Sequence, residues 1–300
     1  EFFIMNFKVL KSKIGFAAEV FGIDARQNVS QEHKIELTRL INEYAVIIFK
    51  NQKINDDQQI KFSENFGTIE PAGTNTELTK MKDRRLSLKM NDVSNLDKNN
   101  KPLAKSNQNR IFGLGNRLWH TDASFKKKPV TFSILSGRKV SAKGGETEFC
   151  DMRCGYKALS KEMKNKVENL IGEHSLQYSR GKLGFVMKDV LSKKELEKFK
   201  PVLQPLVRKN AITNRKSLYL SAHLGLIKGW ELADSILFIN DLIEICACSD
   251  YIYSHKWEEN DLVIWDNTQV MHRGRYFNDQ KEVRDVRRTT IAGTEMLIDQ

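Results

Sequence analysis

Long apolar runs are missing from this sequence of 300 residues. The longest, such as residues 45–49, cover about a quarter of the ~20 residues that a membrane-spanning helix needs. Residues 2–4 are too short for the hydrophobic region of a secretory signal, and residues 1–4, which precede Met5, carry no weight in the prediction. We therefore expect a cytoplasmic protein without a membrane partner.

Clusters of basic residues are equally scarce, although the chain carries 49 lysines and arginines against 38 acidic residues. The formal net charge of +11 favours anionic partners. The only run of three is Lys126-Lys127-Lys128, and no aromatic-interleaved basic stripe accompanies it. We expect a lysine-rich solvated surface and no nucleic-acid partner. The pattern leaves the oligomeric state open, a homo-oligomer included.

Cysteine is limited to two close pairs, Cys150 with Cys154 and Cys246 with Cys248. Neither pair has the CxxC spacing of a zinc knuckle, and two residues at i and i+2 in a strand chelate one ion poorly. In the absence of a secretory signal, we predict reduced and partly buried thiols.

The first 67 residues show a strand–helix–strand–helix pattern. Its expected elements are a strand at 16–23, a helix at 30–44 capped by Ser30, a strand at 45–50, and a helix from Asn55 that Gly67 ends. We expect the first helix to bury one face, which consists of Ile35, Leu40, Ile41 and Tyr44.

Residues 70–115 have little hydrophobic periodicity and contain Pro71-Ala72-Gly73 and several polar runs. A long irregular segment inside a compact domain is usually functional. We therefore predict a loop-rich lid or substrate-side insertion here.

Short β-like runs dominate from residue 118 onward. They lie at 130–136, 146–150, 217–220, 262–265, 270–272 and 286–292, and helices are expected at 157–171 and 230–247. Many short strands with helical insertions predict a mainly β fold with α, a sandwich or jelly-roll core whose edges the helices cover. No feature of the sequence indicates a domain boundary, so we expect a single domain over residues 1–300.

His120-Thr121-Asp122 is the first candidate for chemistry. Residues i and i+2 of a strand point to the same face, so the imidazole and the carboxylate project together. A distant His272, after the apolar strand 261–265, would complete a two-histidine, one-carboxylate set that is typical of non-haem Fe(II). The alternative is a histidine on the surface or at the edge of the core, because the triplet alone is a weak signal.

The segment 282–291 alternates arginine with other residues. Read as a strand, it places Arg284, Val286 and Arg288 on one face. An unpaired guanidinium is costly to bury, so an inward-facing pair would need anions and would act as carboxylate receptors. The alternative is that both arginines point to solvent and form surface ion pairs.

A glycine pair, Gly144-Gly145, precedes a predicted strand and suits a tight turn. Thr147 begins that strand, and its hydroxyl can donate to an acid oxygen. Considered alone, this threonine carries no functional information.

Several blocks together resemble a known family. Residues 116–125, NRLWHTDASF, look like the iron motif of the TauD/TfdA family of Fe(II)/2-oxoglutarate-dependent dioxygenases. Later landmarks match at 144–153, 265–267, 271–275 and 284–290, so that the resemblance runs from about residue 14 to 294. The TEFCDMR and HRGR strings point to the 2,4-dichlorophenoxyacetate dioxygenase branch.

The resemblance implies a double-stranded β-helix (jelly roll) with outer helices and long active-site insertions. His120, Asp122 and His272 would bind Fe(II) and leave three positions of an octahedral ion for 2-oxoglutarate and O2. Arg284, with Thr147, would hold the distal carboxylate of 2-oxoglutarate.

The resemblance also implies a substrate side. Arg288 would meet the anionic group of the substrate, Asn116 would line its site, and Lys101 is a further candidate. We expect a small anionic organic substrate, a carboxylate, sulfonate or similar compound, to be hydroxylated with release of succinate and CO2. A hydroxylated carbon that bears an ether oxygen would collapse, and the ether would be cleaved.

Two other classes of function compete with this prediction. A Zn(II) hydrolase could use the same three ligands, but zinc prefers a tetrahedral site with one water and has no use for an Arg/Thr pocket. A non-enzymatic binding jelly roll needs no converging metal ligands.

Overall fold

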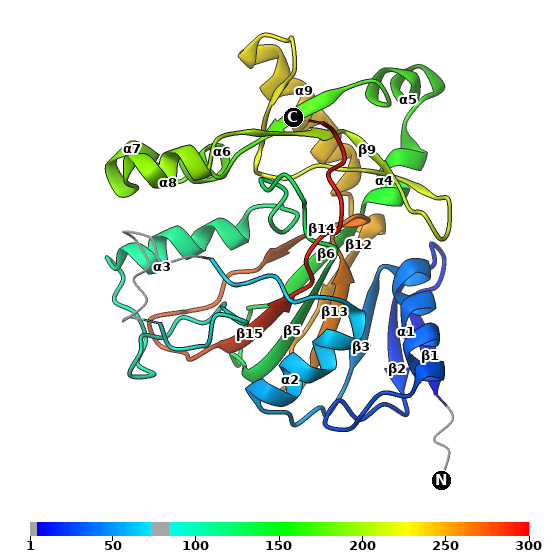
Figure 1. Cartoon of the computed structure of the whole chain (residues 1–300), viewed down its shortest axis with the longest axis vertical. Coiled ribbons are helices and arrows are strands. Elements are labelled where there is room, and N and C mark those ends of the chain that lie inside the picture. Colours follow the sequence, from blue (N-terminus) through cyan, green and yellow to red (C-terminus); the bar gives the residue numbers. More distant parts are fainter. Residues whose placement is uncertain (1–4, 74–83, 300) are drawn as a thin grey trace.

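A seven-stranded sheet is the largest layer of the computed structural model, which describes residues 5–73 and 84–299 (Figure 1). Residues 1–4 and 300, and 74–83 of the predicted insertion, lie outside this description. The order of the strands is β1 (Asn6–Lys11), β2 (Phe16–Phe21), β3 (Val46–Phe49), β13 (Leu262–Asp266), β5 (Phe132–Lys139), β15 (Asp285–Thr290) and β4 (Asn91–Asp92). Only β2 and β3 pair in parallel among these strands.

A smaller antiparallel sheet faces the large one. It consists of β12 (Ile252–His255), β6 (Thr147–Asp151) and β14 (Val270–Gly274). Phe149 and Val270 of this sheet belong to one apolar cluster with Trp265 and Val286 of the large sheet. The residues that alternate with them on β6 and β14, Cys150 and Met271, belong to a second cluster on the opposite face.

Both faces of the large sheet are buried, which explains why its central strands have continuous apolar runs. In β13, Leu262 and Ile264 pack toward the helices α1 (Gln31–Tyr44) and α2 (Asp56–Ser63), whereas Val263 and Trp265 pack toward the small sheet. The chain therefore builds a helix layer, a large sheet and a small sheet, with one apolar cluster between the helices and the large sheet and another between the two sheets.

The first two helices begin where the sequence predicts. Ser30 accepts a hydrogen bond from the backbone N–H of His33 at 3.2 Å, and Asn55 forms a reciprocal capping box with Gln58. The predicted burial of Ile35 is wrong, because its side chain is 63% exposed. Ile35 precedes the buried Leu37 by two positions, which corresponds to a rotation of about 200° around the helix axis. Ile35 therefore lies on the opposite face of the helix.

The helix predicted at 157–171 is confirmed only in part, because its bounds are wrong. The chain forms α4 (Met152–Ala158) and α5 (Lys161–Val167), and Ile171 already belongs to a strand. Ser160 interrupts the helix, because its side chain accepts from the backbone of Met163 at 3.1 Å and caps α5. The helix predicted at 230–247 is confirmed as α9 (Leu232–Cys246).

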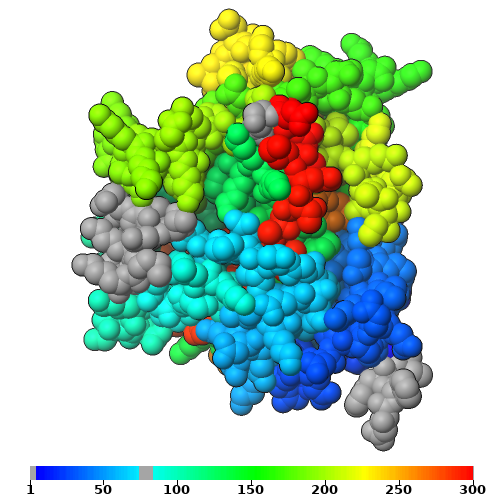
Figure 2. Space-filling view, viewed as in Figure 1, coloured from blue at the N-terminus to red at the C-terminus, as the bar shows by residue number. Residues whose placement is uncertain are grey.

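A third region covers the end of the two facing sheets at which α9 lies (Figure 1). Its strands are β7 (Ile171–His174), β8 (Val202–Pro205), β9 (Val207–Lys209), β10 (Lys216–Leu218) and β11 (Leu224–Ile227). Its short helices are α6 (Leu176–Gly181), α7 (Met187–Val190) and α8 (Lys193–Lys198), and α3 (Gln108–Gly113) lies below them in the view. In the space-filling view the red C-terminal segment crosses the face between α9 and the cyan N-terminal half (Figure 2).

The described part of the chain has no helix that is both long and apolar enough to cross a membrane. All four cysteines are free, and Cys150, Cys154 and Cys246 are buried, as predicted. The described residues of 70–115 are mostly irregular, apart from β4, α3 and the 3-10 turn Leu114–Arg117.

Candidate metal centre and substrate cavity

Two histidines from distant segments lie opposite each other. His120 pairs with His272 of β14 as an isolated antiparallel bridge, with N–O distances of 3.0 and 2.8 Å. Directly opposed residues of an antiparallel pair point to the same face, and the two imidazole centroids are 4.2 Å apart. Since His272 follows Val270 by two positions, that face is the one turned toward the large sheet.

Asp122 completes a cluster of three potential ligands. Its Oδ1 lies 3.7 Å from Nε2 of His120, and its Oδ2 lies 3.7 Å from Nε2 of His272. One ligand atom from each of the three residues lies within 4.8 Å of the others, and all three side chains are buried. The i and i+2 geometry and the cross-strand pair thus bring together the three residues that the sequence nominated.

The protonation states of these residues suit a divalent metal. Nδ1 of His120 lies 2.7 Å from the carbonyl of Leu118, which places the proton there and leaves the Nε2 lone pair toward the cluster. Burial lowers the pKa of both histidines, so both are neutral near pH 7. Burial by itself would raise the pKa of Asp122, but the charge of Arg288 and the hydrogen bond from Ser133 act in the opposite direction, and the pKa of Asp122 is lowered. Two neutral imidazoles and one carboxylate are the donor set of the non-haem Fe(II) facial triad.

A hydrogen-bonded chain fixes the Asp122 carboxylate. Ser133 of β5 donates to its Oδ2 at 2.7 Å, and Asn267 donates to the Ser133 hydroxyl at 3.0 Å. The Asn267 side-chain oxygen accepts from the backbone of Asp122 at 3.2 Å and from the Trp265 indole at 3.0 Å. Sequence reasoning missed Ser133, which carries no motif, whereas Asn267 lies within the block 265–267 that the resemblance marked.

Thr147 and Arg284 are both buried. Arg284 packs beside Gly145, where a Cβ atom would lie 3.4 Å from its Cδ and Nε. Burial, only partly offset by Glu146, lowers the pKa of Arg284 to about 10, and no carboxylate among the described residues forms an ion pair with it. The solvent-facing alternative is therefore wrong for Arg284. Neither residue lines the large cavity described next.

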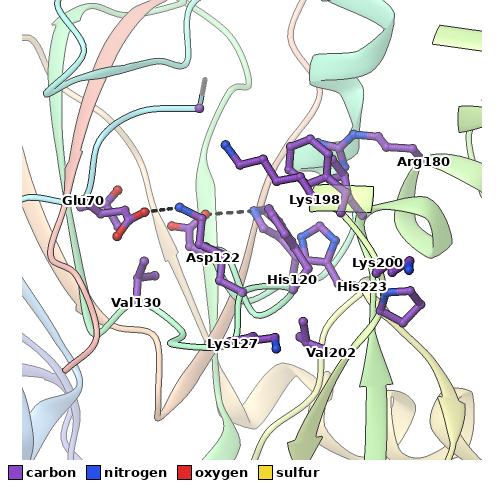
Figure 3. Close-up of a pocket in the computed structure, with 18 of the residues that line it drawn as sticks. Glu70, His120, Asp122, Lys127, Val130, Arg180, Lys198, Lys200, Val202 and His223 are labelled. Atoms are coloured by element: carbon purple, nitrogen blue, oxygen red, sulfur yellow. Dashed lines mark hydrogen bonds and ion pairs between the residues drawn. The ribbon is translucent and has the colours of Figure 1, made fainter. Parts of the chain in front are cut away.

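A cavity of about 1120 Å³ opens beside the metal cluster (Figure 3). Asn116 and Arg288 both line it, and Nη1 of Arg288 donates to Oδ1 of Asp122 at 2.5 Å. The structure does not bring Lys101 to this cavity, because Lys101 is exposed in the turn that begins at Asp97. The apolar part of the lining includes Phe112, Phe125, Val130, Leu176, Leu191, Phe199 and Val202.

Arg180 and His223 also line this cavity, and sequence reasoning missed both. His223 precedes β11, and its ring centroid lies 6.4 Å from that of His120. Arg180 belongs to α6 and is 8% exposed. Neither residue lies in a recognisable motif, so no local signal in the sequence would have found them.

Comparison with known proteins identifies the family of the chain. Residues 6–290 match the taurine catabolism dioxygenase TauD, TfdA family. The chain belongs to this family. The match confirms the resemblance seen in the sequence, and it sets aside the zinc hydrolase and the non-enzymatic binding protein. As a TauD/TfdA-family member the chain is an oxidoreductase, a dioxygenase whose cofactors are Fe(II), 2-oxoglutarate and O2.

Individual relatives cover nearly the whole chain. The alpha-ketoglutarate-dependent 2,4-dichlorophenoxyacetate dioxygenase of Cupriavidus pinatubonensis is 35% identical over 92% of this chain and 94% of its own length. The (S)-phenoxypropionate/alpha-ketoglutarate-dioxygenase of Sphingobium herbicidovorans is 31% identical over 84% of this chain and 83% of its own. The crystal structure of AAD-2 in complex with Mn(II) and N-oxalylglycine is similar with a TM-score of 0.93 and 45% identity, covering 98% of this chain and 99% of that one.

Proposed function

We propose that this dioxygenase hydroxylates an organic acid with an aromatic or similarly apolar body, at a carbon next to an ether oxygen. The observation that carries the proposal is the cavity itself, which joins the metal cluster to Arg288 and to a largely apolar wall that contains three phenylalanines. A substrate that fills it needs both an anionic group and apolar surface. The relatives named for phenoxy acids support this substrate class.

His120, Asp122 and His272 would hold the iron. Bound Fe(II) with 2-oxoglutarate and O2 supplies the oxidising power for C–H hydroxylation and yields succinate and CO2. The protein positions these ligands: the Ser133–Asn267 hydrogen-bonded chain holds Asp122, the backbone bridge aligns His120 with His272, and the carbonyl of Leu118 orients the His120 ring.

Arg284 and Thr147 would bind the distal carboxylate of 2-oxoglutarate. Arg284 is a buried guanidinium without a carboxylate partner among the described residues, so an anionic ligand would remove a desolvation cost. Thr147 accepts from Trp257 at 2.9 Å, which leaves its own O–H free to donate elsewhere. The AAD-2 complex with N-oxalylglycine, which has the same two carboxylates as 2-oxoglutarate, supports a cosubstrate site of this kind in the fold.

Arg288 and Asn116 would position the substrate beside the metal. An anionic group at Arg288 would place the neighbouring carbon close to the reacting oxygen, and the apolar wall would exclude water from it. Hydroxylation next to an ether oxygen gives a hemiacetal, which loses the alcohol or phenol and leaves an aldehyde or keto acid.

The finer description of the fold is part of this proposal. We infer a double-stranded β-helix (jelly roll) in a single domain, with residues 70–115 as the substrate-side insertion. Two facing sheets with a shared apolar core support it, as does the interior position of the metal cluster between them. Four free thiols support a reducing, cytoplasmic location.

The test is succinate formation by the Fe(II)-loaded chain with 2-oxoglutarate and O2, across a panel of phenoxyacetates, phenoxypropionates, alkylsulfonates and sulfate esters. We expect aryloxyalkanoates to stimulate succinate release and to yield the matching phenol. His120→Ala should abolish both products. Stimulation by aliphatic sulfonates alone would refute the aromatic substrate class, and full turnover of the His120→Ala variant would refute the metal assignment.

A further inference from the structure

Arg180 carries a charge that nothing in the described chain neutralises. Its side chain is buried in the wall of the substrate cavity, and no carboxylate among the described residues forms an ion pair with it. Its Nε is buried without a hydrogen-bond partner, and among the described residues Nη1 donates to the hydroxyl of Ser179 at 3.2 Å. Burying a guanidinium in this state is expensive unless a ligand supplies the missing anion.

The position of Arg180 is fixed by its neighbours. Its guanidinium lies 4.3 Å from the ring centroid of Phe112, and a Cβ atom on Gly115 would come within 2.1 Å of Nη1. Only glycine at position 115 leaves room for this approach. The sequence thus holds the cation at the cavity wall even though it provides no counter-ion.

Arg288 is the other arginine of the cavity, and its surroundings differ. It forms an ion pair with Asp122, but its Nε is also buried without a partner. Figure 3 shows Arg180 on the far side of His120 and His223 from Asp122. The cavity therefore presents two separate guanidinium groups with unfilled donors, one beside Asp122 and one beyond His120 and His223.

We propose that Arg180 is a second anion-binding residue of the substrate cavity, and that the substrate is an organic dianion whose two charged groups are separated by an apolar body. One anionic group contacts Arg288 and the other contacts Arg180, next to His223. This inference rests on the proposed function and extends it to the substrate class. Burial lowers the pKa of Arg180 to about 10, which leaves it fully charged at neutral pH. A fixed planar fork receives a carboxylate through two parallel hydrogen bonds.

The experiment compares ligands that differ in one charge. Each of the three ring isomers of (carboxymethoxy)benzoate, all dianions, is matched with its ring methyl ester, a monoanion of similar shape. Succinate release by the Fe(II)-loaded full chain gives kcat and KM for each pair. For at least one isomer, we expect the KM of the dianion to be about 10- to 100-fold lower than that of its ester, the range for a charged hydrogen-bonded contact.

Substitutions of Arg180 test whether this residue causes the preference for the dianion. Arg180→Met keeps an unbranched side chain against Phe112 and should remove the preference for the dianion, whereas Arg180→Lys should retain part of it. Arg39→Met is the matched control, because Arg39 is exposed on α1 and pairs with Glu36 outside the cavity. Thermal unfolding of each variant checks that the fold is intact.

A second measurement separates this inference from the proposed reaction. Calorimetry with the Mn(II)-loaded chain and 2-oxoglutarate measures the affinity for each dianion and its ester without turnover. If no phenoxyacetate yields succinate, the proposed function fails, but dianion-selective binding that Arg180→Met removes still supports the second anion site. The inference is overturned if the wild type binds no dianion more tightly than its ester, or if Arg180→Met keeps that preference. It is also overturned if Arg180→Met lowers the affinities for the dianion and the ester by the same factor.

Discussion

Nε1 of Trp257 donates to Oγ1 of Thr147 over 2.9 Å, and both side chains are buried. The indole can only donate, so the hydroxyl hydrogen of Thr147 stays free to donate to the proposed carboxylate of 2-oxoglutarate. We predict that Trp257→Phe raises the KM for 2-oxoglutarate by about 3- to 10-fold, the value of one lost neutral hydrogen bond. Initial rates at varied 2-oxoglutarate check this, with little change expected in kcat at saturation.

Thr147→Val removes the proposed donor directly, and it should raise the same KM at least as much as Trp257→Phe does. The double variant should add little to Thr147→Val, because the indole acts through the hydroxyl. Additive effects of the two changes would contradict this account and would indicate that Trp257 acts through packing.

Arg284→Met should raise the KM for 2-oxoglutarate by about 30-fold or more, since a desolvated charged contact contributes about 2–5 kcal/mol. The matched control is Arg287→Met, three residues further along in β15, whose side chain pairs with Asp56 and Asp285. That variant should lower Tm and leave the KM for 2-oxoglutarate unchanged. Equal effects of the two variants on this KM would show that the cosubstrate anchor is misplaced.

Ser133→Ala should weaken metal binding by about 10- to 100-fold, the usual effect of removing a partner that orients a metal ligand. The physical reason is that Oδ2 of Asp122 loses its 2.7 Å donor. Ser136→Ala is the control on the same strand, because Ser136 donates to Gln59 at 2.6 Å, away from the metal cluster. The metal affinity of each variant is measured by titrating the purified protein with Fe(II) in the absence of O2, or with Mn(II). Equal affinities of Ser133→Ala and Ser136→Ala would refute the role of Ser133.

His120 and Asp122 could be predicted as a pair because their geometry is local, whereas the third ligand, His272, lies in a distant segment of the chain. The i and i+2 spacing of His120 and Asp122 fixes a shared face, and the short β-like run 270–272 predicts a strand at His272. Helix starts were predictable for the same reason, since Ser30 and Asn55 act on their own first turns.

Features that depend on tertiary packing could not be predicted. Ser133 reaches Asp122 only because β5 lies beside β13 and β15 in the large sheet. Arg180 belongs to a helix of six residues whose placement depends on Phe112 and Gly115, far away in the sequence. Lys101 does not line the cavity, because its backbone N–H donates to the side chain of Asp97 in a turn at the surface.

His174 should make the protein acid-sensitive. It is fully buried, and burial lowers its pKa to about 3 from an ordinary value near 6.5. Between these two values the unfolded chain binds a proton that the folded chain does not, so falling pH favours unfolding by about 1.4 kcal/mol per pH unit. By about pH 3, protonation of this residue in the unfolded chain lowers the free energy of unfolding by about 4–5 kcal/mol in total.

His174→Gln removes this proton linkage while keeping a polar side chain near Ser124, whose hydroxyl lies 3.0 Å from the imidazole. The variant should be less stable than the wild type at pH 7, because the buried site fits an imidazole. The difference in unfolding free energy should then shrink by about 1.4 kcal/mol for each unit below pH 6. Urea denaturation of both proteins from pH 7 to pH 4 measures it, and parallel stability curves would show that His174 titrates normally in the folded state.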